Sequence, residues 1–137
     1  MAAWMHGNGI RPDLIVCSTA VRTRQTLDLV QSAVLTAGTV IELRDELYLA
    51  EAADLIEGIH AVDDRFGHVM VIGHDPGLHE AAVTLVGAGE PAARQALASK
   101  FPTAGVAVID FACSRWQRLA AGTGKLRLFM TPKRLAD

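Results

Sequence analysis

The chain has 137 residues, of which 50% are hydrophobic and 20% are charged, and its formal net charge is −2. This composition predicts a single folded domain with a sizeable core and excludes an intrinsically disordered chain. The small negative charge argues against nucleic acid and membrane surfaces as partners. No apolar run approaches the roughly 20 residues that a membrane span requires.

The N-terminal residues are typical of the C-terminal end of a helix. Residues 2–5 fit the last turn of an amphipathic helix, and Gly7 and Gly9 are stop signals. The segment has neither the basic start nor the long apolar centre of a secretion signal. Cys17 and Cys113 lie in apolar stretches, which predicts buried free thiols and a cytoplasmic location.

A strand followed by a helix comes next. Residues 14–17 are apolar and predict a short strand, ended by Ser18, and residues 20–37 predict a helix that stops at Gly38. The expected buried face of this helix consists of Val21, Leu27, Val30, Val34 and Leu35. Arg22 lies in the first turn, where the helix dipole disfavours a cation. Its planar fork suits a phosphate held by the helix N–H groups, although an ordinary surface arginine fits the local pattern as well.

The middle of the chain alternates between strands and helices. Residues 40–43 predict a short strand, and residues 44–46 a polar loop. Residues 50–62 predict a helix with Ala53, Ile56 and Ile59 on one face, and residues 63–67 a loop.

His74 follows the apolar run 69–72, which predicts a strand buried on both faces. Gly73 allows a sharp turn, Asp75 is a good N-cap, and Pro76 suits the first helical position. Ligands of open α/β sheets bind at the carboxyl ends of strands, so His74 is placed for an anion site. A histidine that merely bonds the turn explains the local pattern equally well.

The C-terminal part is richer in strands. Residues 87–89 are expected to close the helix after His74, and residues 91–100 to form another helix. Residues 106–111 predict a strand, residues 116–119 its hairpin partner, and residues 126–130 a further strand. The whole pattern predicts an α/β fold, a three-layer α/β/α sandwich with a mostly parallel sheet and an antiparallel edge.

Two segments together resemble the histidine phosphatase superfamily. They are Ser18-Thr19-Ala20-Val21-Arg22-Thr23-Arg24-Gln25-Thr26 and Val71-Ile72-Gly73-His74-Asp75-Pro76-Gly77. The closest resemblance is to the SixA-type phosphohistidine phosphatases. Further supporting phrases are Arg11-Pro12-Asp13-Leu14, Glu46-Leu47-Tyr48-Leu49-Ala50, Phe101-Pro102-Thr103-Ala104-Gly105 and Thr131-Pro132-Lys133-Arg134-Leu135.

The resemblance implies a phosphoryl transfer to a histidine, followed by hydrolysis. By motif, Arg22 and His74 match the second clamp arginine and the second histidine of the family, and backbone N–H groups near Ser18 and His74 add phosphate donors. The nucleophile of the family lies in an Arg-His-Gly motif after the first strand, and the sequence contains no such motif. We therefore expect a single histidine phosphatase-like domain over residues 1–137 that lacks its first strand and helix, through N-terminal truncation.

Other assignments of the chemistry are weaker. His6 precedes Gly7 but follows no apolar run, and Cys17 stands one residue too close to Arg22 for a cysteine phosphatase loop. His68, His74 and His79 do not form a metal-ligand set, since His68 and His74 fall at opposite ends of a strand; no metal and no cofactor are expected. Glu46 is a weak candidate for a proton donor, and His60 and His79 are expected on helix surfaces.

Two functions remain at this point. One is a SixA-like phosphatase without its nucleophile segment, inactive as given; the other is a degenerate module that binds phosphate or a phosphoprotein. The expected partners are a phosphohistidine protein or a small phosphate ester, without nucleic acid or membrane. Unpaired strand edges also favour self-association. An in-frame Arg-His-Gly segment upstream of Met1 would favour the enzyme, and an in-frame stop the module.

Overall fold

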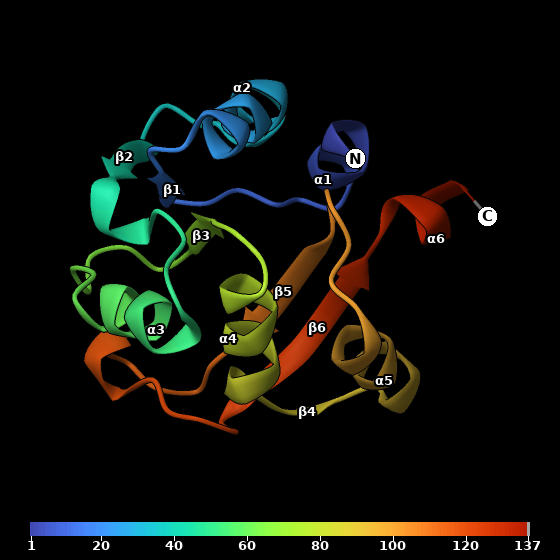
Figure 1. The fold of residues 1–137 in the computed structure, drawn as a ribbon. Coiled ribbons are helices and arrows are strands. Elements are labelled where there is room, and N and C mark those ends of the chain that lie inside the picture. The colour runs from blue at the N-terminus through green and yellow to red at the C-terminus, as the bar shows by residue number, and fades with distance from the viewer. Residues whose placement is uncertain (137) are drawn as a thin grey trace. The chain divides into compact units, whose positions relative to one another are not determined.

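The structure, a computed structural model, describes residues 1–136 and confirms the predicted α/β class (Figure 1). The chain divides into two compact units. The first consists of Met1–Ala50 and Asp63–His74, and the second of Glu51–Val62 and Asp75–Asp137. Each unit has its own three-stranded sheet. In the described part of the chain, no helix combines the length and the apolar character needed to cross a membrane.

The first unit is built on a parallel sheet with the strand order β2-β1-β3. Its elements are α1 (Ala2–Gly7), β1 (Leu14–Ser18), α2 (Val21–Val34), β2 (Val40–Arg44), the 3-10 helix η1 (Asp45–Leu47) and β3 (Val69–Ile72). The central strand β1 is buried at every position, whereas three of the four residues of β3 are only partly buried. The prediction that β3 is buried on both faces is therefore wrong, because β3 is an edge strand of its sheet.

Helix α2 presents a narrower buried face than its sequence predicts. It ends at Val34 rather than Ala37, and Thr23, Leu27 and Val34 are its buried residues. Val21 was expected in this face but is 67% exposed. At about 100° per residue, Val21 points about 200° away from Thr23, so it cannot share that residue's side of the helix.

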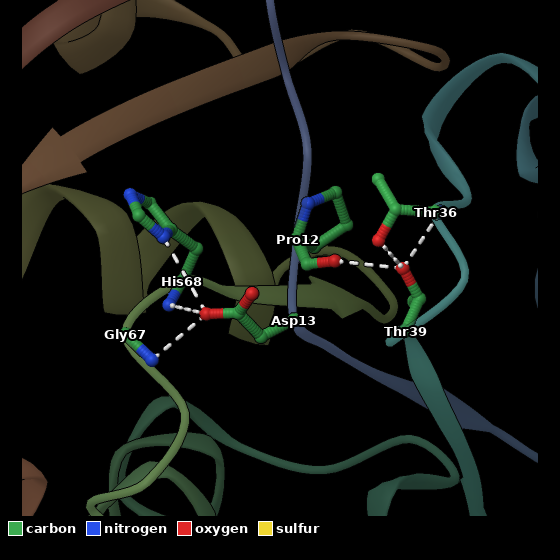
Figure 2. A network of polar contacts seen from close by, with 6 residues as sticks. All are labelled: Pro12, Asp13, Thr36, Thr39, Gly67 and His68. Atoms are coloured by element: carbon green, nitrogen blue, oxygen red, sulfur yellow. Dashed lines mark hydrogen bonds and ion pairs between the residues drawn. The ribbon is translucent and has the colours of Figure 1, made fainter.

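Asp13 ties together the segments that enter β1 and β3 (Figure 2). Its Oδ2 accepts hydrogen bonds from the backbone N–H groups of Gly67 at 2.9 Å and His68 at 3.1 Å. The imidazole Nδ1 of His68 lies 3.5 Å from the same oxygen. On the other side, the Thr39 hydroxyl donates to the Pro12 carbonyl at 3.0 Å. Side chains thus fix the amino ends of all three strands of this sheet.

Substitution of Asp13 by asparagine is expected to make the first unit less stable at neutral pH. Burial raises the pKa of the Asp13 carboxyl, but the amide hydrogen bonds from Gly67 and His68 outweigh it, and the pKa lies below its ordinary value. The stabilisation is therefore present above about pH 4 and disappears as the pH falls through the lowered pKa. Urea unfolding against pH measures this. The difference between wild type and Asp13→Asn should shrink in acid. Asp28→Asn, on the exposed side of α2, is the matched control.

The second unit has a mixed sheet with the strand order β4-β6-β5. Its elements are α3 (Ala52–His60), α4 (Gly77–Leu85), β4 (Val86–Gly89), α5 (Pro91–Ser99), β5 (Val106–Asp110), the 3-10 helix η2 (Trp116–Arg118), β6 (Gly124–Met130) and α6 (Pro132–Ala136). Strand β6 pairs parallel with β4 and antiparallel with β5. The core of the second unit consists of Ala82, Leu97, Leu126 and Phe129, with Phe101 and Ile109 packed against it.

Two helices of this unit begin and pack differently from the predictions. In α4 the N-cap is Pro76, not Asp75, and no side chain caps the helix; the first helical bond runs from the Glu80 N–H to the Pro76 carbonyl. In α3 the buried residue is Leu55, whereas Ala53 is exposed.

The segment after α4 is a strand, and the prediction that residues 87–89 only close the helix is wrong. Strand β4 pairs with β6 from Val86 to Gly89. A Cβ atom on Gly87 would lie 1.9 Å from the carbonyl oxygen of Gly122, so the glycine allows two backbones to approach closely. Glycine serves here in strand packing rather than as a helix stop.

The predicted hairpin of residues 116–119 with β5 is also wrong. Trp116 begins the 3-10 helix η2, and the antiparallel partner of β5 is β6, with Val106 opposite Met130. The Leu119 carbonyl is held by His60 Nε2 at 2.6 Å, which anchors this segment on α3 instead of the sheet. His60 is therefore partly buried and hydrogen-bonded, not the surface residue that was expected.

Candidate active site

The candidate site lies at the carboxyl ends of β1 and β3. These strands are parallel, with Cys17 opposite Ile72, so the residues that follow them meet at one edge of the sheet. There, His74 Nε2 lies 2.8 Å from Ser18 Oγ. Ser18 is fully buried, and His74 is partly buried. The structure therefore brings together two of the three residues that the sequence assigned to a phosphate site.

The first turn of α2 is joined to the same edge. The Thr23 hydroxyl lies 2.8 Å from the Ser18 carbonyl and 2.9 Å from the Ala20 carbonyl, which fastens the helix start to the end of β1. No side chain caps this helix, and its first turn has no acidic residue. Free N–H groups and the positive end of the helix dipole favour an anion at such a position.

Arg22 lies in this first turn and is exposed. Among residues 1–136 its guanidinium has no hydrogen bond and no ion pair, so its charge is available to a ligand. Arg44 differs in this respect: it lies opposite Ser18 at the end of β2, and its Nη2 pairs with Glu42 at 2.8 Å. Of these two arginines beside the sheet edge, only Arg22 has a guanidinium that no carboxylate neutralises.

Tyr48 contacts the candidate site, although the sequence did not assign it there. Its ring meets the His74 imidazole edge-on, with centroids 5.8 Å apart and an interplanar angle of 64°. Tyr48 is nevertheless 58% exposed, and Leu49 after it is 66% exposed with a φ of 53°. The sequence signal was the phrase Glu46-Leu47-Tyr48-Leu49-Ala50, which supported the family resemblance but assigned no role to Tyr48. Glu46, on the preceding turn η1, is exposed.

His6 lies at the wrong end of α2 to serve this site. Its Nδ1 is 3.3 Å from the Ala33 carbonyl and 3.3 Å from Arg11 Nη2. Ala33 follows Arg22 by eleven residues along the helix, or about 16 Å at 1.5 Å per residue. The sequence-based rejection of His6 as the nucleophile thus has a geometric basis.

The other histidines are occupied elsewhere in the structure. His68 lies beside Asp13, at the opposite end of β3 from His74. His79 was expected on a helix surface, but it is partly buried and its Nε2 contacts the Leu97 carbonyl at 2.5 Å. Within residues 1–136, no three His, Cys, Asp or Glu side chains gather closely enough to hold a metal ion.

The two cysteines should react at very different rates with a thiol reagent. Cys17 is fully buried in β1, and burial raises the pKa of its thiol. Cys113 is exposed, contrary to the prediction that both are buried, because it follows the end of β5 in an irregular segment. Titration of the native protein with Ellman's reagent should therefore show one fast thiol, which Cys113→Ser removes. A fast second thiol in that variant would contradict the burial of Cys17.

Comparisons with known proteins place these features in context. The chain is 31% identical over 131 residues to an uncharacterised protein of Mycobacterium leprae, covering 95% of this chain and 78% of that one. An uncharacterised protein of Mycobacterium tuberculosis is 32% identical over 136 residues, with 95% and 80% covered. The sequence matches no family model.

Solved structures give the family. A structure assigned to the phosphohistidine phosphatase SixA of Agrobacterium tumefaciens is 33% identical, with a TM-score of 0.75, and the match covers 96% of this chain and 75% of that chain. A second, assigned to SixA of Nakamurella multipartitia, is 29% identical, with a TM-score of 0.80 and 96% and 77% covered. The chain therefore belongs to the SixA-type branch of the histidine phosphatase superfamily.

Proposed function

We propose that this chain forms the phosphate-binding part of a SixA-like phosphohistidine phosphatase. The observation that carries the proposal is the contact between His74 and Ser18 at the carboxyl edge of the first sheet, beside the uncapped start of α2. Phosphohistidine proteins are the proposed substrates, as the names of the similar structures suggest, and small phosphate esters are the alternative.

The proposed roles follow from the charge of a phosphoryl group in transfer. Negative charge accumulates on its peripheral oxygens, and fixed donors that face these oxygens lower the barrier. Arg22 supplies a planar, permanently charged fork, and His74 supplies a ring N–H. The N–H groups at the start of α2 supply neutral donors without an energetic cost of reorganisation. Ser18 contributes through its backbone and by its contact with His74.

This chain of 137 residues is expected to bind phosphate without hydrolysing a phosphohistidine. It contains no Arg-His-Gly motif, and His6 lies at the far end of α2 from Arg22. We would titrate the ¹⁵N-labelled chain with inorganic phosphate and follow the amides of Ser18, Arg22 and His74. In parallel, a phosphohistidine peptide would be assayed for release of phosphate. Shifts at the three amides without turnover are expected.

Two results would overturn this proposal. If the amide resonances at the sheet edge do not shift with millimolar phosphate, the proposed phosphate site is contradicted. Turnover that His6→Ala abolishes would restore His6 as a nucleophile and contradict the assigned geometry. Arg11→Ala is a useful control, because Arg11 contacts His6 rather than the sheet edge.

A non-catalytic phosphoprotein-binding module is the second candidate function, and the absence of an Arg-His-Gly motif from the sequence favours it. An enzyme of this type carries a phosphohistidine of its own during turnover, whereas a binding module releases its phosphoprotein unchanged. Translation of the DNA upstream of Met1 separates the two, since an in-frame Arg-His-Gly segment would supply the nucleophile.

A further inference from the structure

The Ser18 hydroxyl has a limited set of neighbours, and these determine which way it donates. Ser18 is fully buried, so its hydroxyl is closed to bulk solvent. Its Oγ lies 3.3 Å from the Ala20 backbone N–H, which can only donate to it. The other polar neighbour of Oγ is His74 Nε2 at 2.8 Å. Within residues 1–136, His74 Nε2 is therefore the acceptor available to the hydroxyl hydrogen.

This arrangement sets the protonation of the His74 ring. A neutral imidazole carries one hydrogen, and the nitrogen that accepts a hydrogen bond cannot carry it. If Nε2 accepts from Ser18, the hydrogen resides on Nδ1. The opposite tautomer would direct two donors, the Ala20 N–H and the Nε2–H, at Ser18 Oγ and leave a buried hydroxyl hydrogen without an acceptor. Leaving a buried polar group unsatisfied is unfavourable, so the Nδ1–H form is preferred.

We propose that Ser18 is a positioning residue that holds His74 in the Nδ1–H tautomer, so that Nδ1–H is the donor offered to a phosphoryl oxygen. Tyr48 supports this placement, because its ring packs edge-on against the imidazole and restricts its rotation. The Thr23 hydroxyl holds the Ser18 carbonyl and thus fixes the serine backbone. The role offered to Nδ1–H rests on the proposed function, whereas the tautomer is a property of the free protein.

The tautomer is measured directly by long-range ¹H–¹⁵N correlation of the His74 ring. The spectrum is recorded at about pH 8.5, well above the ordinary imidazole pKa of about 6.5. We expect a protonated Nδ1 and an unprotonated Nε2 in the wild type. Ser18→Ala should give a mixture of tautomers, and Ser18→Thr, which keeps a hydroxyl, should restore the wild-type pattern. Ser99→Ala is the matched control, since it removes a serine hydroxyl that bonds the Gln95 carbonyl on α5 and does not contact Ser18 or His74.

A wild-type spectrum with a protonated Nε2 would overturn the proposal. This test needs no variant, so it holds even if Ser18→Ala fails to fold. An equal loss of the tautomer in Ser99→Ala would also overturn it, because the effect would then not come from the Ser18 hydroxyl. Retention of the Nδ1–H form in a folded Ser18→Ala protein would do the same.

Titration with inorganic phosphate separates this proposal from the proposed function. We expect phosphate to shift the Nδ1 resonance in the wild type, and Ser18→Ala to bind about threefold to tenfold more weakly, as for the loss of one neutral hydrogen bond. An Nδ1–H tautomer that does not respond to phosphate would support the role of Ser18 and contradict the phosphate site. Phosphate binding with an Nε2–H tautomer would support the phosphate site and contradict the role of Ser18.

Discussion

Arg22→Ala is expected to weaken binding of inorganic phosphate by about tenfold to a hundredfold. A hydrogen bond from a charged group contributes about 1.5–3 kcal/mol, and 1.4 kcal/mol corresponds to tenfold in affinity. Among residues 1–136 the Arg22 guanidinium has no competing partner, so its full charge is available to the anion. In a protein that also carries an Arg-His-Gly segment, the same change should lower the phosphatase rate by about 10²–10³.

Arg24→Ala is the matched control for this prediction. Arg24 lies on the same helix, is also exposed and carries the same charge. Two residues along an α-helix correspond to a rotation of about 200°, so Arg24 points away from the direction of Arg22. Isothermal titration with phosphate at two salt concentrations would measure both variants. Equal losses in the two variants would indicate a general effect of net charge and would contradict a clamp at Arg22.

Gly87→Ala is expected to destabilise the second unit by about 3 kcal/mol or more. The added methyl group would lie 1.9 Å from the Gly122 carbonyl oxygen, and further contacts at 2.6 Å and 3.0 Å involve the same glycine's backbone. Backbone atoms cannot rotate away as a side chain can, so β4 or the turn before β6 must move. Overpacking of this kind costs about 1–3 kcal/mol, and more when the backbone itself has to move.

Amide hydrogen exchange would locate this loss. Protection should fall in β4 and β6, where Val86 pairs with Gly124 and Gly89 with Leu126. Gly38→Ala is the control, because a Cβ atom there meets no other atom within 4 Å. Its effect should stay within about 0.5 kcal/mol. Unchanged protection of β6 in Gly87→Ala would show that the chain has another way to pack these strands.

The sequence was most informative where local pattern and environment agree. Strand β1 and helix α2 were predicted because an apolar run is followed by helical spacing, and the parallel pairing of β1 with β3 then brings Ser18 and His74 to one edge. The contact between their side chains was not predictable, since it depends on the register of residues 56 positions apart. Tyr48 was missed for a similar reason, because its ring contact with His74 joins residues that are far apart in the sequence.

The errors occurred where one residue type serves two purposes. Gly87 was interpreted as a helix stop, yet only its distance from Gly122 reveals the close approach of β4 to the turn before β6. Residues 116–119 were predicted to be the hairpin partner of β5, but the antiparallel position beside β5 is taken by β6. Asp75 is a good N-cap by type, and the helix begins after Pro76 instead. For Gly87 and for residues 116–119, the deciding information lies in a partner segment later in the chain.

The position of β3 at the edge of the first unit's sheet has a consequence for the site. Strand β3 pairs with β1 and ends its sheet, and His74 follows two residues after its last position, Ile72. A further strand that docks in parallel on this side would have its alignment dictated by the β3 ladder. A residue of that strand placed beyond Ile72 would lie at the edge of the sheet where His74 follows β3. The hydrogen-bonding groups of β3 would therefore set how close the end of such a strand comes to His74. This holds whether the strand comes from the same polypeptide or from another molecule.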